Sequence, residues 1–81
     1  MTDPEIKEII FRLLGGIAPE ANFAELLPDE NLREVLDIDS FDFLNFLIGL
    51  NAELGIDIPE SDYGQLATLA DIVSYISARV S

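Results

Sequence analysis

The sequence predicts an all-α fold, a small helical bundle of three main helices and one short one. Three segments place apolar residues at the spacing of an amphipathic helix. Glycine and proline residues, which terminate or interrupt helices, separate these segments. The chain of 81 residues is long enough for one small domain, so we expect residues 1–81 to form a single domain.

The first main helix is predicted between Asp3 and Gly15-Gly16. Asp3 is a suitable cap, and Pro4 suits the first helical position, where no N–H is needed. The glycine pair is expected to end the helix. The apolar residues between these limits form one core-facing stripe: Ile6, Ile9, Ile10, Leu13 and Leu14. We interpret this helix as a scaffold element.

Residues 17–34 are predicted to be a long irregular connection with its own packing. Pro19 and Pro28 interrupt it, and residues 21–27 are suited to a short helical turn. The connection and the residues after it carry apolar side chains that we expect to pack on the core: Phe23, Leu26, Leu27, Leu32, Val35 and Leu36.

The second main helix is predicted from about Ser40 to Leu54, where Gly55 stops it. At about 100° per residue, one apolar stripe forms the core face: Phe43, Phe46, Leu47, Leu50 and Leu54. Phe41, Leu44 and Ile48 form a second apolar stripe on nearly the opposite side. Burial on all sides is difficult in so small a domain, so the second stripe is more simply explained as a docking surface than as core.

The remaining elements are a short helix or turn at residues 60–65 and a last main helix. Residues 56–59 form a turn and a short extended piece before them. Tyr63 and Leu66 are expected to point inward. Thr68 and Asp71 resemble a capping box at the start of the last helix. Its core residues continue at helical spacing: Ile72, Val73, Ile76 and Val80.

The charge of the chain limits its partners. Sixteen acidic and four basic residues give a formal net charge of −12, which repels nucleic acid and anionic membranes. We therefore expect no nucleic-acid or membrane partner, and instead proteins with basic docking patches. The N-terminus is acidic and helical rather than a signal peptide, and no run approaches the length of a membrane span. We expect a soluble, cytoplasmic, monomeric domain.

The absent residue types exclude several chemistries. The chain contains no cysteine and no histidine. Ser-His-Asp and Cys-His nucleophilic sites are therefore impossible, and the usual zinc ligands are missing. A calcium loop at Asp37 and Asp39 is disfavoured, because Phe41 occupies the next ligand position and no glycine follows. We expect neither an enzyme nor a metal site.

Three motifs resemble those of the acyl carrier proteins. Asp39-Ser40-Phe41 resembles the D-S-L signature of this family, whose serine carries a 4′-phosphopantetheine arm. Ile56-Asp57-Ile58-Pro59 is similar to the family's short segment before its third helix. Thr68-Leu69 through Tyr75-Ile76 is similar to the opening of its fourth helix. On these motifs the chain is identified as a member of the family.

The resemblance implies a function for Ser40. A phosphopantetheinyl transferase would move the arm from coenzyme A to this serine, and the terminal thiol would hold an acyl group as a thioester. The arm thereby supplies the thiol that the chain lacks. Given this function, we assign Asp39 and Asp42 to contacts with the transferase, because their like charge opposes the phosphate. The second apolar stripe, Phe41, Leu44 and Ile48, is expected to dock the transferase and the acyl-loading and acyl-processing enzymes. Residues that would line the acyl chain, and that are equally well explained as core, are Phe46, Leu47, Leu50 and Ile58.

The chain departs from the family pattern around the signature. Asp37 and Ile38 stand where the family usually has Gly or Ala-like residues, and Phe41 replaces the usual leucine. The family's helix commonly carries several glutamates after the signature, whereas this chain has Asn45, Asn51 and Ala52 at such positions. The docking face is therefore less acidic and more aromatic than is usual in the family, which favours a specialised carrier over housekeeping fatty-acid synthesis. Two alternatives stay open. One is a peptidyl or aryl carrier of a nonribosomal pathway, although its Gly-Gly-His/Asp-Ser motif is not present. The other is an unmodified helical interaction domain in which Ser40 only caps the helix.

Overall fold

Residues 1–80, which the computed structural model describes, form a helical bundle, so the predicted all-α fold is confirmed. Three helices are long: α1 (Asp3–Ile17), α3 (Ser40–Leu54) and α4 (Leu69–Val80). Three are short: the α-helix α2 (Leu32–Val35) and the 3₁₀-helices η1 (Phe23–Glu25) and η2 (Glu60–Gln65). None of the helices in this part of the chain has both the length and the apolar character needed to cross a bilayer.

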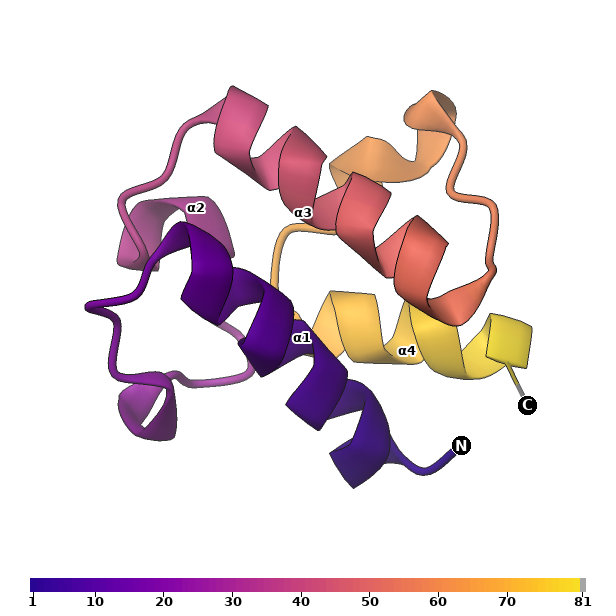
Figure 1. Cartoon of the computed structure of the whole chain (residues 1–81), viewed down its shortest axis with the longest axis horizontal. Coiled ribbons are helices and arrows are strands. Elements are labelled where there is room, and N and C mark those ends of the chain that lie inside the picture. The colour runs from indigo at the N-terminus through magenta and orange to yellow at the C-terminus, as the bar shows by residue number, and fades with distance from the viewer. Residues whose placement is uncertain (81) are drawn as a thin grey trace.

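The core lies between the three long helices. Helix α1 packs against both α3 and α4, and Figure 1 shows it running alongside α3, with α4 to the right of α1 and below α3. The side chains that are buried almost completely come from all three helices and from the segments between them: Ile6, Ile10, Leu14, Leu32, Phe46, Leu47, Leu50, Leu66, Ile72 and Ile76. Gly49 allows α1 to approach α3 closely, because a Cβ atom there would lie 3.3 Å from Leu13 Cδ2.

Both predicted limits of α1 are wrong by one or more residues. Thr2, rather than Asp3, caps the helix in a reciprocal capping box with Glu5. The Glu5 N–H donates to Thr2 Oγ1 at 3.3 Å, and the Thr2 N–H donates to Glu5 Oε1 at 3.0 Å. Hydrogen bonds from Thr2 lower the pKa of the Glu5 carboxyl. At the other end the glycine pair does not stop the helix, which continues to Ile17, a partly buried side chain that packs on the core.

The connection between α1 and α3 is more ordered than predicted, because Asn31 starts the unpredicted helix α2. Its Oδ1 accepts hydrogen bonds from the N–H groups of Arg33 and Glu34, at 3.0 and 3.2 Å. The predicted turn within residues 21–27 is confirmed as η1. Phe23 holds this turn by stacking on Phe11, with ring centroids 5.4 Å apart.

Two of the six apolar side chains expected to anchor this region do not do so. Leu32 is buried, and Phe23, Leu26 and Leu36 pack partly buried against the core. Leu27 and Val35 are instead 57% and 44% exposed. Leu27 lies in the irregular segment after η1, and Val35 is the last residue of the short helix α2. Single apolar residues are common on protein surfaces, so their apolar character alone did not indicate which way they point.

The second half of the chain follows the prediction closely. Gly55, with φ of 66°, adopts the left-handed conformation that ends α3. The short helix at residues 60–65 is confirmed as η2. Thr68 Oγ1 accepts the N–H of Asp71 at 3.1 Å at the start of α4. An isolated antiparallel bridge joins Asn31 and Thr68, and so ties the start of α2 to the start of α4.

Candidate functional site

Ser40 is the first residue of α3, and its neighbour caps the helix. Asp39 occupies the cap position, and its Oδ1 accepts the Asp42 N–H at 2.8 Å. Ser40 is exposed, and its hydroxyl is not required for capping. The first backbone N–H groups of a helix have no intrahelical partner and carry partial positive charge, so this end of α3 is favourable for an anion. Because Asp39 holds the cap position, the explanation of Ser40 as the helix cap is wrong.

The turn before Ser40 has an unusual backbone. Asp37 has φ of 53°, a left-handed conformation that aspartate tolerates better than most residues with a side chain. The turn is closed by hydrogen bonds back to α2, including one from the Ile38 N–H to the Arg33 carbonyl at 3.1 Å. Helix α2 and this turn together fix where α3 begins, and therefore where the serine lies.

The outward stripe of α3 is exposed. Phe41 is 68% exposed and Ile48 is 55% exposed, whereas Leu44 between them is half-buried. The possibility that α3 is buried on all sides is therefore wrong. Phe41 and Leu44 also line a shallow hollow with Ser40, Glu60 and Tyr63. Apolar side chains and the serine thus share one continuous surface.

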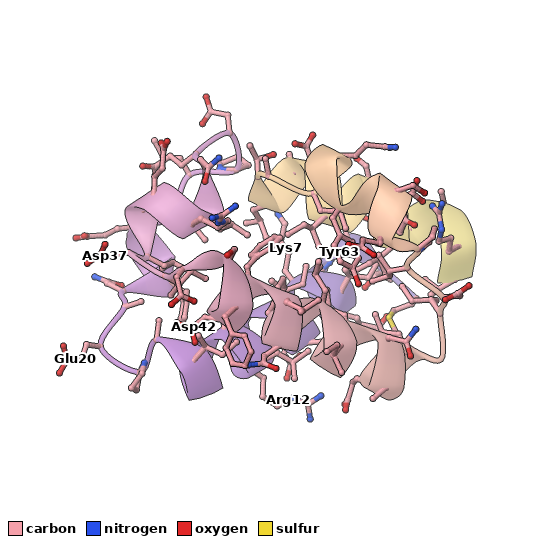
Figure 2. All side chains as sticks on the ribbon, turned by 90° about the horizontal axis from the view of Figure 1, so that it is seen from above. Lys7, Arg12, Glu20, Asp37, Asp42 and Tyr63 are labelled. Carbon is pink, nitrogen blue, oxygen red and sulfur yellow. The ribbon has the colours of Figure 1, made fainter. Side chains whose placement is uncertain are left out.

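Acidic side chains surround the start of α3. Figure 2 shows Glu20, Asp37 and Asp42 at the same end of the molecule. These three acids line one hollow between the α1–α2 connection and α3. Asp42 is half-buried, while Asp37 and Asp39 are exposed. This end of the molecule is therefore both acidic and apolar, the combination that a partner with a basic and apolar patch would complement.

A cavity of about 280 Å³ opens beside Ser40. Its walls come from α2, α3, η2 and the residues that follow η2: Asn31, Arg33, Ser40, Phe43, Leu44, Leu47, Tyr63, Gly64, Leu66 and Ala67. Of the four residues expected to line an acyl chain, Leu47 borders this cavity. Phe46, Leu50 and Ile58 are buried elsewhere in the core, at 1%, 0% and 7% exposure.

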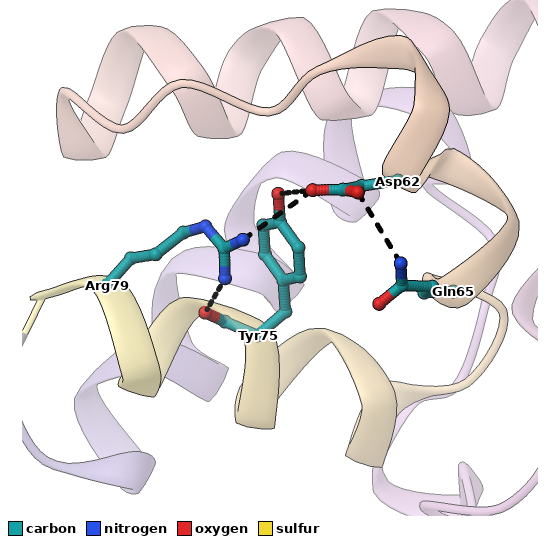
Figure 3. A network of polar contacts seen from close by, with 4 residues as sticks. All are labelled: Asp62, Gln65, Tyr75 and Arg79. Carbon is teal, nitrogen blue, oxygen red and sulfur yellow. Dashed lines mark hydrogen bonds and ion pairs between the residues drawn. The ribbon is translucent and has the colours of Figure 1, made fainter.

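A polar network holds the η2 wall of this cavity against α4 (Figure 3). The Tyr75 hydroxyl donates a hydrogen bond to Asp62 Oδ2 at 2.6 Å, and Arg79 forms an ion pair with the same oxygen at 3.5 Å. The Arg79 guanidinium lies 3.4 Å from the centre of the Tyr75 ring. Burial of the ring and its hydrogen bond to Asp62 raise the pKa of Tyr75.

Sequence reasoning assigned no role at the site to Arg33 or Asn31, which both line the cavity. Arg33 could have been noticed, because cations are rare in this chain and it lies only seven residues before the serine. Asn31 gave no comparable signal: its position became meaningful only when α2 was seen to start there.

Comparisons with known proteins agree on one family. Residues 4–76 match the family model described as "Phosphopantetheine attachment site". The chain is similar to an acyl carrier protein of Renibacterium salmoninarum, at 36% identity over 78% of this chain and 73% of the relative. It is also similar to one from Chlamydia caviae, at 31% identity over 95% of this chain and 94% of the relative.

A solved structure supports the same conclusion. The solution structure of a putative acyl carrier protein from Anaplasma phagocytophilum matches with a TM-score of 0.74 and 25% sequence identity, over 91% of this chain and 90% of that one. These comparisons do not favour the nonribosomal carrier or the unmodified interaction domain. The chain therefore belongs to the acyl carrier protein family, whose members are carriers rather than enzymes and hold acyl groups on phosphopantetheine.

Proposed function

We propose that Ser40 is the attachment site of the 4′-phosphopantetheine arm. The observation that supports this proposal most directly is that Asp39 caps α3. The exposed Ser40 hydroxyl at the helix start is therefore not needed for capping. A transferase would direct the Ser40 oxygen to the phosphorus of coenzyme A that bears the pantetheine. The Ser40 oxygen would form the new P–O bond while the pyrophosphate P–O bond breaks, so that adenosine 3′,5′-bisphosphate leaves and the hydroxyl proton passes to a base of the transferase or to water.

The start of α3 supports a phosphodiester at this position. Free N–H groups and the helix dipole favour its negative charge. Asp39 and Asp42 oppose it by like-charge repulsion, and both are close to the serine in sequence. We assign these two acids to contacts with the transferase, because a basic surface on that enzyme would attract their negative charge.

The exposed stripe of Phe41, Leu44 and Ile48 would dock the partner enzymes. Interfaces gain most of their affinity from a few apolar or aromatic side chains that become buried on binding. The stripe provides such side chains next to the serine, with acids around them. Its partners would be the transferase and the enzymes that load and process the acyl group, in fatty-acid or related acyl metabolism. We expect the carrier to act as a cytoplasmic monomer formed by residues 1–81.

The cavity beside Ser40 would shelter the start of the acyl group. Phe43, Leu44, Leu47 and Leu66 provide apolar walls. Phe46, Leu50 and Ile58 would contact an acyl chain only if it separated the helices and deepened the cavity. The wall that has to move for this is η2, which the Asp62–Tyr75–Arg79 network holds in place.

Intact-mass measurement tests the attachment site. The apo protein is incubated with coenzyme A, magnesium and a broad-specificity phosphopantetheinyl transferase. We expect the mass to rise by one phosphopantetheine in the wild type and in Ser61→Ala, a control at another exposed serine, but not in Ser40→Ala. Circular dichroism should show Ser40→Ala to be folded, since Asp39 still caps α3. A mass increase that persists in Ser40→Ala would place the arm elsewhere.

A further inference from the structure

We propose that Arg33 selects the cargo: the cavity beside Ser40 takes a short acyl group that ends in a carboxylate, and the Arg33 guanidinium holds that carboxylate. The inference rests on the proposed function, because it assumes a thioester tethered at Ser40. It concerns which acyl group is carried, which the family membership leaves open.

Arg33 is one of the few cations of the chain. The chain has only four basic residues against sixteen acidic ones. Within residues 1–80, the other two arginines form ion pairs, Arg12 with Glu53 and Arg79 with Asp62. Arg33 takes part in neither pair and borders the cavity that Ser40 also borders. A cation that belongs to neither ion pair therefore lines the same cavity as the serine in a strongly acidic protein.

The surroundings of Arg33 favour an anionic ligand in the cavity over a neighbouring side chain. Glu34 and Asp37 line an adjoining hollow together with Arg33, yet neither carboxylate forms an ion pair with it in the described part of the chain. These acids weaken the attraction of Arg33 for an anion, but neither occupies its guanidinium through direct pairing. A guanidinium can bind a carboxylate through two parallel hydrogen bonds, a geometry that a lysine could not reproduce.

The two sides of the cavity differ in chemistry. The α2 side contributes Arg33 and Asn31, and the side-chain amide of Asn31 retains donor hydrogens because its oxygen accepts the bonds that cap α2. The α3 side contributes Phe43, Leu44 and Leu47. A ligand that matches both sides has a short hydrocarbon portion and a terminal acceptor group with negative charge.

The size of the cavity and the tether indicate a short ligand. A volume of about 280 Å³ lies just below the range of roughly 300–1,000 Å³ that is typical of small-molecule sites. A flexible tether gives its end group an effective concentration on the order of millimolar. An exposed ion pair alone is much too weak to give half-occupancy at this concentration, so the apolar wall must contribute the rest of the binding free energy.

The experiment compares two cargoes that differ only at the last carbon. Valeryl and glutaryl groups both have five carbons, but glutaryl ends in a carboxylate. Each is attached through amide analogues of pantetheine, which resist hydrolysis on heating, and loading is checked by intact mass. The melting temperature is then measured for the arm alone, the valeryl form and the glutaryl form, in the wild type and in Arg33→Gln. Arg12→Gln is the matched control, because it removes the same charge from an exposed ion pair with Glu53.

We expect Arg33→Gln to lower the melting temperature of the glutaryl form, relative to the valeryl form, by roughly 2–4 °C. Arg12→Gln should leave this difference unchanged. The proposal is overturned if Arg33→Gln leaves the difference unchanged as well. It is also overturned if the substitution shifts all three forms equally, because Arg33 would then act on a part that the three forms share, such as the phosphodiester or the fold itself. A failure to load either group would instead contradict the attachment at Ser40, and intact mass reveals this before any melting curve is recorded.

Discussion

The two faces of α3 carry the same kinds of side chain in opposite environments. Phe43 and Leu47 on the inner face are 8% and 2% exposed, whereas Phe41 and Ile48 on the outer face are 68% and 55% exposed. Burial of a large apolar side chain stabilises a fold by roughly 1.5–3 kcal/mol, and an exposed one contributes little. The inner face therefore explains why the chain folds. The outer face requires another explanation, which docking of partner enzymes provides.

The largest expected effect is on the inner face. Leu50 is fully buried, so Leu50→Ala should lower the free energy of unfolding by about 2–5 kcal/mol through the cavity that it leaves. Ile48→Ala, on the outer face of the same helix, should change it by no more than about 0.5 kcal/mol. Urea denaturation followed by circular dichroism measures both. Equal losses would mean that the outer face also stabilises the fold.

The next effect separates Asp39 from Ser40 at the start of α3. Asp39→Ala removes the cap and should lower the free energy of unfolding by about 0.5–2 kcal/mol. Ser40→Ala should cost less than about 0.5 kcal/mol, since its hydroxyl does not cap the helix. Thermal and urea unfolding of the two variants measure both losses of stability. A larger loss of stability in Ser40→Ala than in Asp39→Ala would show that the serine hydroxyl stabilises the helix start.

A smaller effect concerns the network that holds η2 against α4. Burial and the Asp62 hydrogen bond raise the pKa of Tyr75 in the folded state, so the unfolded chain loses the phenolic proton first. The resulting stabilisation is fully present below about pH 10, the ordinary pKa of tyrosine, and is lost as the pH rises through the folded pKa.

Unfolding measured between pH 8 and pH 11 should therefore show a steeper alkaline loss of stability in the wild type than in Tyr75→Phe. Asp62→Asn keeps the phenol and removes the carboxylate, so its alkaline loss should lie between the two. If Tyr75→Phe loses stability as steeply as the wild type, titration of Tyr75 is not coupled to folding.

Periodicity was sufficient to predict the long helices and the two stripes of α3, because the spacing of apolar residues repeats over several turns. The limits of α1 were harder to predict. Thr2 and Asp3 are both good caps, and only the reciprocal bonds with Glu5 decide between them. A helix can also pass through a glycine at a cost of only about 1 kcal/mol when packing supports its last turn. Helix α2 was missed because four residues are too few to show a period.

The site was predictable at the serine and much less so around it. The motif at Ser40 is local in sequence, so its position at the start of a helix followed directly. The cavity depends on how α2, α3 and η2 pack together, and no single segment encodes that arrangement. Arg33 and Tyr63 are 30 residues apart in sequence and line the same cavity. The left-handed turn at Asp37 was also unexpected, because glycine is the usual residue for that conformation.

The most direct test of the proposed division between the two faces of α3 measures transfer and stability on the same variants. Phe41→Ala and Ile48→Ala are compared with Asn45→Ala, a control at an exposed polar residue of α3. The account predicts that both apolar variants lower kcat/KM of a phosphopantetheinyl transferase by roughly tenfold, a loss of about 1.4 kcal/mol that only the minority of strongly contributing interface residues produce. Their melting temperatures should stay close to that of the wild type, as should both properties of Asn45→Ala. Unchanged kcat/KM in both apolar variants, or a loss of stability as large as that of Leu50→Ala, would contradict the account.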